Sequence, residues 1–168
     1  MELDNIYVRP LVPDEWELLR RVRIRAVSMH THYFLETPEG AENRSESFWR
    51  DGLSGIGKCI FGMFDKKDII GISGVFTHRE FPDGKTADFG MTFIEPAYRG
   101  LKLSRLFYEA RINWARENGF ERIEISHHIE NEASKNANQR FGFKYVGEHM
   151  RDWPDGTRAL DIKYELVL

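Results

Sequence analysis

The segment FGMTFIEPAYRGLKLSRLFYEARINWARENG, residues 89–119, decides the fold. Its first part reads as a strand, and from Leu103 onward apolar residues recur at the spacings of three and four that mark one helix face. The turn YRGLKLS, residues 98–104, joins the two. A strand that passes directly into a helix often binds an anion, because the helix start presents unpaired N–H groups and the positive end of its dipole. The segment therefore predicts a strand, an anion-binding turn and a helix in succession.

Further strands and helices are expected on both sides of this segment. Hydrophobic periodicity and turn residues predict strands over residues 6–11, 58–65, 68–78, 86–96, 120–126, 144–151 and 158–168. They predict helices over residues 13–29, 45–53, 103–119 and 131–141, and a loop over residues 30–44. The strand–helix–strand unit in the second half predicts one parallel strand pair, and the other pairs are expected to be antiparallel. The predicted fold class is α/β, with one mixed central sheet of about seven strands and helices on both faces.

The composition is that of an ordinary globular protein. Of the 168 residues, 41% are hydrophobic and 30% charged, and no linker or repeat divides them, so residues 1–168 are expected to form a single domain. The net charge of −3 gives no reason to expect nucleic acid or an anionic membrane as a partner. The longest apolar runs fall well short of the ~20 residues that span a bilayer.

Cysteine and histidine usage argues against a metal site. Cys59 is the single cysteine, so neither an internal disulfide nor a thiolate cluster can form. His30 and His32 lack a third ligand at suitable spacing and read as loop residues. We expect no metal, and the free thiol favours a reducing, cytoplasmic location.

The turn resembles the coenzyme-binding motif of the GNAT superfamily, the acyl-CoA-dependent N-acyltransferases. Members carry Arg/Gln-x-x-Gly-x-Gly/Ala between the fourth strand and the next helix, and the corresponding residues here are Arg99, Gly100, Leu101, Lys102, Leu103 and Ser104. The resemblance implies that their backbone N–H groups bind the coenzyme A pyrophosphate. Lysine replaces the motif's first glycine. A positive φ at Lys102 would cost ~1 kcal/mol or more of strain. We expect a negative φ, which keeps backbone donation and adds a charge beside the phosphates.

A second motif follows the next strand. The stretch NEASKNANQRFGF is similar to the family's Asn-x-x-Ala/Ser-x-x-x-Tyr-x-x-x-Gly-Phe, and the residues in register are Asn131, Ser134, Gly142 and Phe143. The motif's tyrosine, which protonates the departing thiolate in many members, is replaced by Asn138. An amide is no acid near neutral pH, but it donates hydrogen bonds. The resemblance implies that Asn131 and Asn138 lie at the thiol end of the coenzyme and that the Asn138 N–H meets the thiolate.

The resemblance implies an enzyme that moves an acetyl group from its cosubstrate, acetyl-CoA, to a primary amine by direct attack in a ternary complex. Phe93 and Ile94 stand where the strand backbone of members pairs with the pantetheine arm, although apolar residues are equally expected in a core strand. Cys59 lies in an apolar strand pattern and reads as a buried hydrophobe, not as a nucleophile. Tyr108 and Tyr145 are nearby substitutes for the missing tyrosine.

Besides Asn138, two residues are candidates for catalytic proton transfer. Asp88 stands on the fourth strand, where some protein-acetylating members carry a catalytic glutamate, and burial would raise its pKa toward that of a useful base. The sequence favours the other interpretation, a solvated residue at the start of the strand. His127 either lines the cleft between the fourth and fifth strands or is a structural histidine. His128, on the opposite strand face, is expected to be exposed.

The acceptor is expected between the segment of residues 28–49 and the hairpin of residues 151–157, which border the acceptor site in members of the family. Several acidic residues favour a cationic amine there: Glu36, Glu39 and Glu42. Trp153 in the hairpin covers the acceptor, forms a dimer contact or anchors the turn. The expected partner is a small-molecule or peptide amine, and a homodimer is compatible with the sequence. The sequence specifies neither the acceptor nor whether a longer acyl-CoA is preferred.

Two competing hypotheses accompany the acetyltransferase. The changes at Asn138 and Lys102 are also consistent with a non-catalytic acyl-CoA-binding regulatory module of the same fold, which would bind coenzyme A without turnover. A structural or interaction protein would bind no coenzyme at all. The sequence ranks the enzyme first, the regulatory module second and the interaction protein third.

Overall fold

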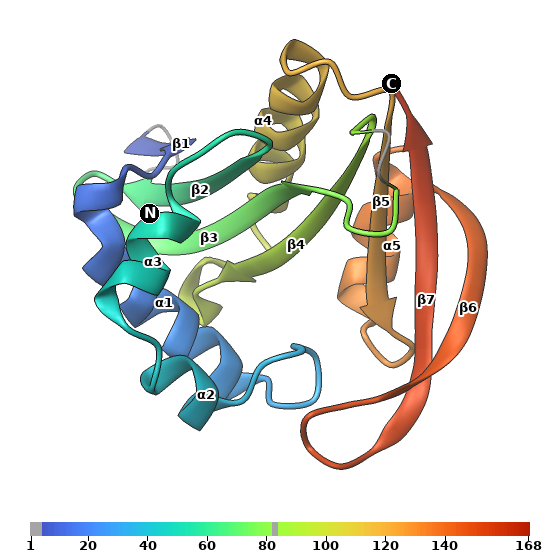
Figure 1. Cartoon of the computed structure of the whole chain (residues 1–168), viewed down its shortest axis with the longest axis horizontal. Helices are drawn as coiled ribbons and strands as arrows, with labels where there is room; N and C mark the ends of the chain where they lie inside the picture. Colours follow the sequence, from blue (N-terminus) through green and yellow to red (C-terminus); the bar gives the residue numbers. More distant parts are fainter. Residues whose placement is uncertain (1–4, 82–83) are drawn as a thin grey trace.

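The computed structural model describes residues 5–81 and 84–168. Their strands form one seven-stranded sheet in the order β1-β2-β3-β4-β5-β7-β6 (Figure 1). The strands are β1 (Ile6–Pro10), β2 (Lys58–Asp65), β3 (Asp68–Thr77), β4 (Thr86–Ile94), β5 (Arg122–His128), β6 (Lys144–Asp152) and β7 (Arg158–Val167). Only β4 and β5 are parallel, so the predicted α/β class with a mixed sheet is confirmed.

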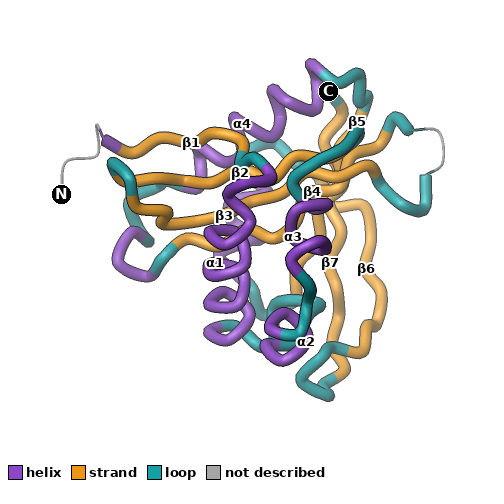
Figure 2. Tube along the Cα trace, turned by 60° about the vertical axis from the view of Figure 1, so that its left-hand side comes forward, coloured by secondary structure: helices purple, strands orange, loops and turns teal. Residues whose placement is uncertain are grey.

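Helices lie on both faces of the sheet, as predicted (Figures 1 and 2). They are α1 (Trp16–Met29), α2 (Pro38–Glu42), α3 (Glu46–Gly52), α4 (Ser104–Glu117) and α5 (Glu132–Arg140), with 3-10 turns η2 (Pro13–Glu15) and η3 (Pro96–Tyr98). On one face, Leu19 and Val27 of α1 and Trp49 of α3 share a core with Ile72 of β3. On the other face, α4 and α5 pack on the sheet, and the core there includes Phe107.

The helix boundaries follow from local sequence chemistry, with one difference from the expectation. The side chain of Ser45 accepts a hydrogen bond from the Phe48 N–H and caps α3. The region expected to be a loop, residues 30–44, contains the short helix α2. Thr37 caps it by accepting from the Gly40 N–H, and Pro38 fits its first turn. Among the described residues, no helix has the length and apolar character to cross a membrane.

The parallel strands β4 and β5 pair over only four residues and then diverge. Their register runs from Thr86 opposite Arg122 to Phe89 opposite Ile125, and the remaining residues of the two strands do not pair. The register between β3 and β4 shifts near the same point, and Met91 has a φ of 60°. An irregularity of this kind bends a strand and increases its twist. The end of β4, residues 90–94, therefore presents to β5 an edge without a β-strand partner.

One face of the sheet is only partly covered. Helix α1 packs over β3, whereas β5, β7 and β6 lie beyond it (Figure 2). Residues opposite one another in register point to the same face. Asp88 lies opposite Glu124, and Ser126 lies opposite Lys163, so polar side chains occupy the face that the helices leave open.

Candidate active site

The turn between β4 and α4 presents a series of backbone donors. Gly100 has a φ of 79° and Lys102 a φ of 60°, and no side chain caps the start of α4. Within the described parts of the chain, the N–H groups of residues 100–104 have no hydrogen-bond acceptor. Successive free N–H groups in such a turn, together with the helix dipole, favour an anion with several oxygens. The turn fits the pyrophosphate of coenzyme A on these grounds.

The expectation of a negative φ at Lys102 is wrong. The residue adopts the left-handed conformation and stands one position before Leu103, whose φ of −66° and ψ of −22° begin the helical region. The glycine of the family motif is therefore replaced at a position that does favour glycine. The conformation costs about 1–2 kcal/mol for a residue with a Cβ. Lys102 nevertheless lines the cavity beside the turn, so the residue brings a positive charge to the site of the N–H donors.

Arg99 secures the turn to its surroundings. Its Nε donates to the carbonyl of Ile94 at 2.8 Å, and its guanidinium carbon lies 5.4 Å from the ring centre of Phe93. A terminal nitrogen lies 2.9 Å from Nε2 of His30, in the loop after α1. Burial and then the adjacent Arg99 charge lower the pKa of His30, which favours the neutral ring as acceptor. Arg99 thus joins the turn, the end of β4 and the loop.

A cavity of about 820 Å³, here called the turn cavity, extends from this turn along β4 to α5. Phe93 and Ile94 line it, and their backbone belongs to the edge without a β5 partner. At the other end, Asn131 caps α5 by accepting a hydrogen bond from the Ser134 N–H at 3.2 Å. Both residues line the cavity. Except for Leu101, which does not line the cavity, the cofactor-binding candidates from the turn, the strand and Asn131 therefore face one space.

Asn138 lies behind this space and does not line it. The residue is fully buried, and its Oδ1 accepts a hydrogen bond from the hydroxyl of Tyr108 on α4. Tyr108 does line the cavity, and burial raises the pKa of its hydroxyl. Tyr145 is exposed on β6 and donates to Glu148. Of the two tyrosines considered as substitutes, only Tyr108 therefore faces the turn cavity.

His127 is buried and lines the turn cavity from β5. Its Nδ1 lies 2.8 Å from the carbonyl oxygen of His128, and its ring stacks on Tyr164 at 5.5 Å. Its Nε2 is buried and has no hydrogen-bond partner among the described residues. A buried, unpaired nitrogen at a cavity wall is a site for a ligand contact. The geometry is consistent with both interpretations of His127, as a cleft residue and as a packed one.

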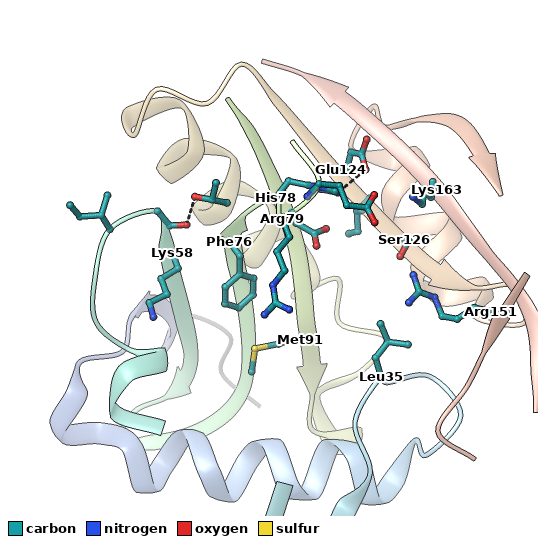
Figure 3. A pocket seen from close by; sticks show the side chains of 16 residues that line it. Leu35, Lys58, Phe76, His78, Arg79, Met91, Glu124, Ser126, Arg151 and Lys163 are labelled. Carbon is teal, nitrogen blue, oxygen red and sulfur yellow. Dashed lines mark hydrogen bonds and ion pairs between the residues drawn. The ribbon is translucent and has the colours of Figure 1, made fainter. Parts of the chain in front are cut away.

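A second cavity, of about 670 Å³, lies over the open face of the sheet and is here called the sheet cavity (Figure 3). It shares part of its wall with the turn cavity, and the shared residues are Leu35, Asp88, Met91, Ile125 and Ser126. Asp88 is thus the only carboxylate that lines both spaces in the described chain. A group that enters the sheet cavity reaches the diverging strands at this residue.

The surroundings of Asp88 make its carboxyl a weak acid. The residue is exposed, as the sequence interpretation favoured, yet desolvation of its carboxyl by the surrounding protein raises its pKa to about 6. His78 and Lys163 oppose this rise, while the nearby carboxyls of Glu124 and Asp161 add to it. At neutral pH the group is mostly ionised and accepts a proton more readily than an ordinary aspartate.

The residues expected around the acceptor are only partly placed as predicted. Trp153 is buried, donates from Nε1 to the Ala159 carbonyl at 3.4 Å and lines the turn cavity. The expectation that His128 is exposed is wrong, because its ring packs 4.7 Å from that of Trp153. Glu39 and Glu42 line neither cavity.

Much of the polar lining of the sheet cavity is what the sequence reasoning missed. It includes Arg79 and Lys163, whereas Arg151 begins the hairpin that the sequence placed at the acceptor. The sequence contained a signal for this lining, because polar side chains recur at every second position of β5. Glu124 and Ser126 of β5 share one face with Lys163 of β7. Polar residues at every second position of interior strands indicate a face that no helix covers.

The chain belongs to the GNAT acetyltransferase family. The model of the acetyltransferase (GNAT) domain matches residues 5–144, which is most of the chain. Members of this family use acetyl-CoA, which agrees with the donors of the turn cavity. The sequence-based assignment to the family and its cosubstrate is thereby confirmed. No curated protein matches the sequence significantly.

Solved structures share the fold at low sequence identity. A putative acetyltransferase from Acinetobacter baylyi aligns with a TM-score of 0.83 and 21% identity over 97% of this chain and 93% of its own. The putative acetyltransferase yncA from Salmonella typhimurium, with its cofactor acetyl-CoA, gives 0.81 and 19% over 98% and 94%. An acetyltransferase of the same organism that modifies the N-terminal serine of ribosomal protein L7/L12 gives 0.74 and 14% over 98% and 95%.

Proposed function

We propose that this protein transfers an acetyl group from acetyl-CoA to a primary amine by direct attack in a ternary complex. The coenzyme occupies the turn cavity, and the amine approaches through the sheet cavity. The observation that carries the proposal is the position of Asp88 in the wall shared by the two spaces. A base at this junction is within reach of an amine that meets the acetyl group there.

The residues of the chain divide the work between binding and proton transfer. The N–H groups of residues 100–104 and the Lys102 ammonium hold the pyrophosphate, and the β4 edge at Phe93 and Ile94 pairs with the pantetheine arm. Bound acetyl-CoA supplies an activated thioester carbonyl. Asp88 accepts the proton of the attacking amine. Positioning the two reactants contributes most of the rate enhancement.

No residue is proposed as an acyl-enzyme nucleophile. Burial raises the pKa of the Cys59 thiol to about 11, so the thiolate is scarce at neutral pH. Cys59 also lines neither cavity. Direct attack by the amine therefore accounts for the reaction without a covalent intermediate.

Tyr108 is the proton donor that we assign to the departing thiolate. Tyr108 lines the turn cavity, and the raised pKa of its hydroxyl keeps that group protonated. Asn138 holds this hydroxyl from behind and acts through it as a positioning residue. The pair takes over the task of the tyrosine that the family motif places at residue 138.

The test is release of free coenzyme A thiol from acetyl-CoA over a panel of primary amines, with the parent and Asp88→Asn. Loss of a general base lowers kcat/KM roughly 100- to 10,000-fold, whereas acetyl-CoA affinity should not change. With a weakly basic amine, kcat/KM of the parent should fall below pH about 6 as Asp88 takes up a proton. Asp68→Asn, at the exposed start of β3, is the matched control and should behave like the parent.

Unfolding measurements on the parent and Asp88→Asn test whether a loss of activity is a loss of fold. Desolvation raises the pKa of Asp88 above that of a free carboxyl, so the folded protein holds this proton more tightly than the unfolded chain. The resulting contribution of Asp88 to the free energy of unfolding is complete below about pH 4 and is lost as the pH rises through about 6. Asp88→Asn should therefore unfold no more easily than the parent at pH 7. Turnover that survives this substitution would exclude Asp88 as the base. Tight coenzyme binding without turnover of any amine would support the regulatory module instead.

A further inference from the structure

The sheet cavity carries an unusual number of basic side chains for a site that accepts an amine. Four of them line it: Lys58, Arg79, Arg151 and Lys163. Figure 3 shows Arg79 on one side of the space and Arg151 and Lys163 on the other. A cationic acceptor alone would be repelled by such a lining.

Two of these cations bind protein groups, and the other two have no salt-bridge partner among the described residues. Arg151 donates twice to Oδ2 of the buried Asp161, at 2.7 and 3.0 Å, and the Lys58 ammonium donates to the Asp51 carbonyl. Arg79 and Lys163 form no salt bridge within residues 5–81 and 84–168. Lys163 is half-buried and has no carboxylate within salt-bridge distance among the described residues, although its charge acts on Asp88, so an anion that enters the cavity would be favoured there.

The acidic groups that line the sheet cavity are Glu80, Asp88 and Glu124, one fewer than its four basic residues. Glu124 lies 3.0 Å from Nε2 of His78, and Glu80 is exposed beside Arg79. Glu36, which the sequence suggested as a partner for a cationic amine, is bound by Arg23 at 2.9 Å and Arg44 at 3.5 Å. Asp88 is reserved for the reacting amine under the proposed function. The charges therefore do not suit a polyamine.

Part of the cavity wall is apolar. Phe76 lines it, as do Leu35 and Met91 of the wall shared with the turn cavity. An apolar surface of this kind favours burial of an aliphatic or aromatic side chain. The cavity thus combines a base for an amine, free cations for an anion and an apolar wall.

We propose that the acceptor is a free α-amino acid with an apolar side chain, whose carboxylate is bound by Lys163, with Arg79 adding positive charge from the other side of the cavity, while its amine faces Asp88. This inference rests on the proposed function and names its substrate class. A protein N-terminus lacks the carboxylate next to the amine and would leave both cations unpaired.

The test compares leucine with leucinamide as acceptors, because the two differ at the carboxylate. The parent should show at least a roughly tenfold higher kcat/KM for leucine, the equivalent of one charge-assisted hydrogen bond. Leucinamide has the less basic amine and so more of the reactive neutral form, so amine reactivity cannot produce this preference. Lys163→Gln and Arg79→Gln should each reduce the leucine-to-leucinamide ratio by roughly tenfold.

The ratio separates anion binding from other effects of these substitutions. Lys163 also opposes the desolvation that raises the pKa of Asp88, and its loss affects both acceptors through that base equally. Lys144→Gln, an exposed residue that lines neither cavity, is the matched control and should keep the parent ratio. An equal or higher kcat/KM for leucinamide, or for a polyamine such as spermidine, would overturn the inference.

Calorimetric binding of the product analogue N-acetyl-leucine distinguishes this inference from the proposed function. Lys163-dependent binding of N-acetyl-leucine over its amide, without any amine turnover, would support the anion site and reject the enzyme. Turnover of amines without a preference for the carboxylate would support the enzyme and reject the anion site. A protein that shows no turnover and no preferential binding of N-acetyl-leucine would reject both the anion site and the enzyme.

Discussion

At the scale of single residues, Lys102 combines a structural cost with a charge in the coenzyme site. Its φ of 60° belongs to a conformation that glycine adopts freely, and its side chain lines the turn cavity. Lys102 is therefore strained in its backbone at the position where its positive charge would favour a bound pyrophosphate. This arrangement leads to a prediction in which stability and binding change in opposite directions.

Lys102→Gly should stabilise the protein and weaken its hold on acetyl-CoA. Relief of the left-handed strain, reduced by the greater freedom of glycine in the unfolded chain, should raise the free energy of unfolding by about 1 kcal/mol. Loss of the ammonium should raise the dissociation constant a few-fold, with a weaker dependence on salt. Urea unfolding and calorimetric titration with acetyl-CoA check the two effects.

Lys102→Gln separates the two contributions, since glutamine keeps the Cβ and removes the charge. It should weaken coenzyme binding like the glycine variant but leave the free energy of unfolding near that of the parent. A glutamine variant as stable as the glycine variant would show that the charge, and not the backbone, is the source of strain.

The residues of the coenzyme site were largely predictable, but their conformations and partners were not. The motif placed Arg99, Lys102 and Asn131 correctly at one cavity, because a strand–turn–helix unit fixes these positions locally. The sign of φ at Lys102 was wrong, since a charged residue at a turn gives no information about its own backbone. Asn138 and Tyr108 belong to different helices, and their contact depends on how the helices pack.

At the scale of elements, α4 and α5 meet through the bond between Tyr108 and Asn138. The hydroxyl donates to Oδ1, the ring of Tyr108 stacks on Phe141 at 4.3 Å, and Nδ2 of Asn138 has no partner among the described residues. Phe141 directly follows α5, so the tyrosine packs against the end of the helix that carries its partner. The packing of the two helices thereby fixes Tyr108 in the wall of the turn cavity.

Tyr108→Phe should lower kcat roughly 100-fold while the KM for acetyl-CoA stays near the parent value. Removing the hydroxyl removes the proton donor but keeps the ring that shapes the cavity. The pH profile of kcat supplies the decisive readout. In the parent, kcat should fall at alkaline pH as Tyr108 ionises, and this limb should be absent from the variant.

The same substitution leaves Asn138 without a partner for Oδ1 and should cost about 1–3 kcal/mol of stability. A purely structural tyrosine would produce this loss without altering the shape of the pH profile. An unchanged alkaline limb in a folded Tyr108→Phe variant would therefore remove Tyr108 from the chemistry.

The elements themselves were the most predictable part of the molecule. All seven strands and the long helices α1 and α4 appear where periodicity indicated them, because each buries an apolar face that the sequence repeats. Helix α2 was missed, since its five residues are too few to show a period and its cap at Thr37 is the main signal. Short capped helices depend on single hydrogen bonds that a pattern does not reveal.

At the scale of the whole molecule, the active site lies where two halves of the sheet separate. Strands β1 to β4 form one half, and β5, β7 and β6 form the other, joined by the four-residue ladder between β4 and β5. The turn cavity and the sheet cavity meet at this point through Asp88 and Met91. Under the proposed function, coenzyme and acceptor would reach one another from separate entrances, which is the geometry that a ternary complex requires.

The edge of β4 that lacks a β5 partner also allows coenzyme binding to be followed by hydrogen exchange of the backbone. Amide protons at residues 90–94 that face β5 have no strand partner to shield them, so they should take up deuterium from heavy water quickly. A bound pantetheine arm that pairs with this edge should slow the uptake, while Thr86 to Phe89 in the paired ladder should change little. Mass spectrometry of peptides from β4 would then distinguish occupied from empty molecules without any turnover, and uptake that ignores saturating acetyl-CoA would place the coenzyme elsewhere.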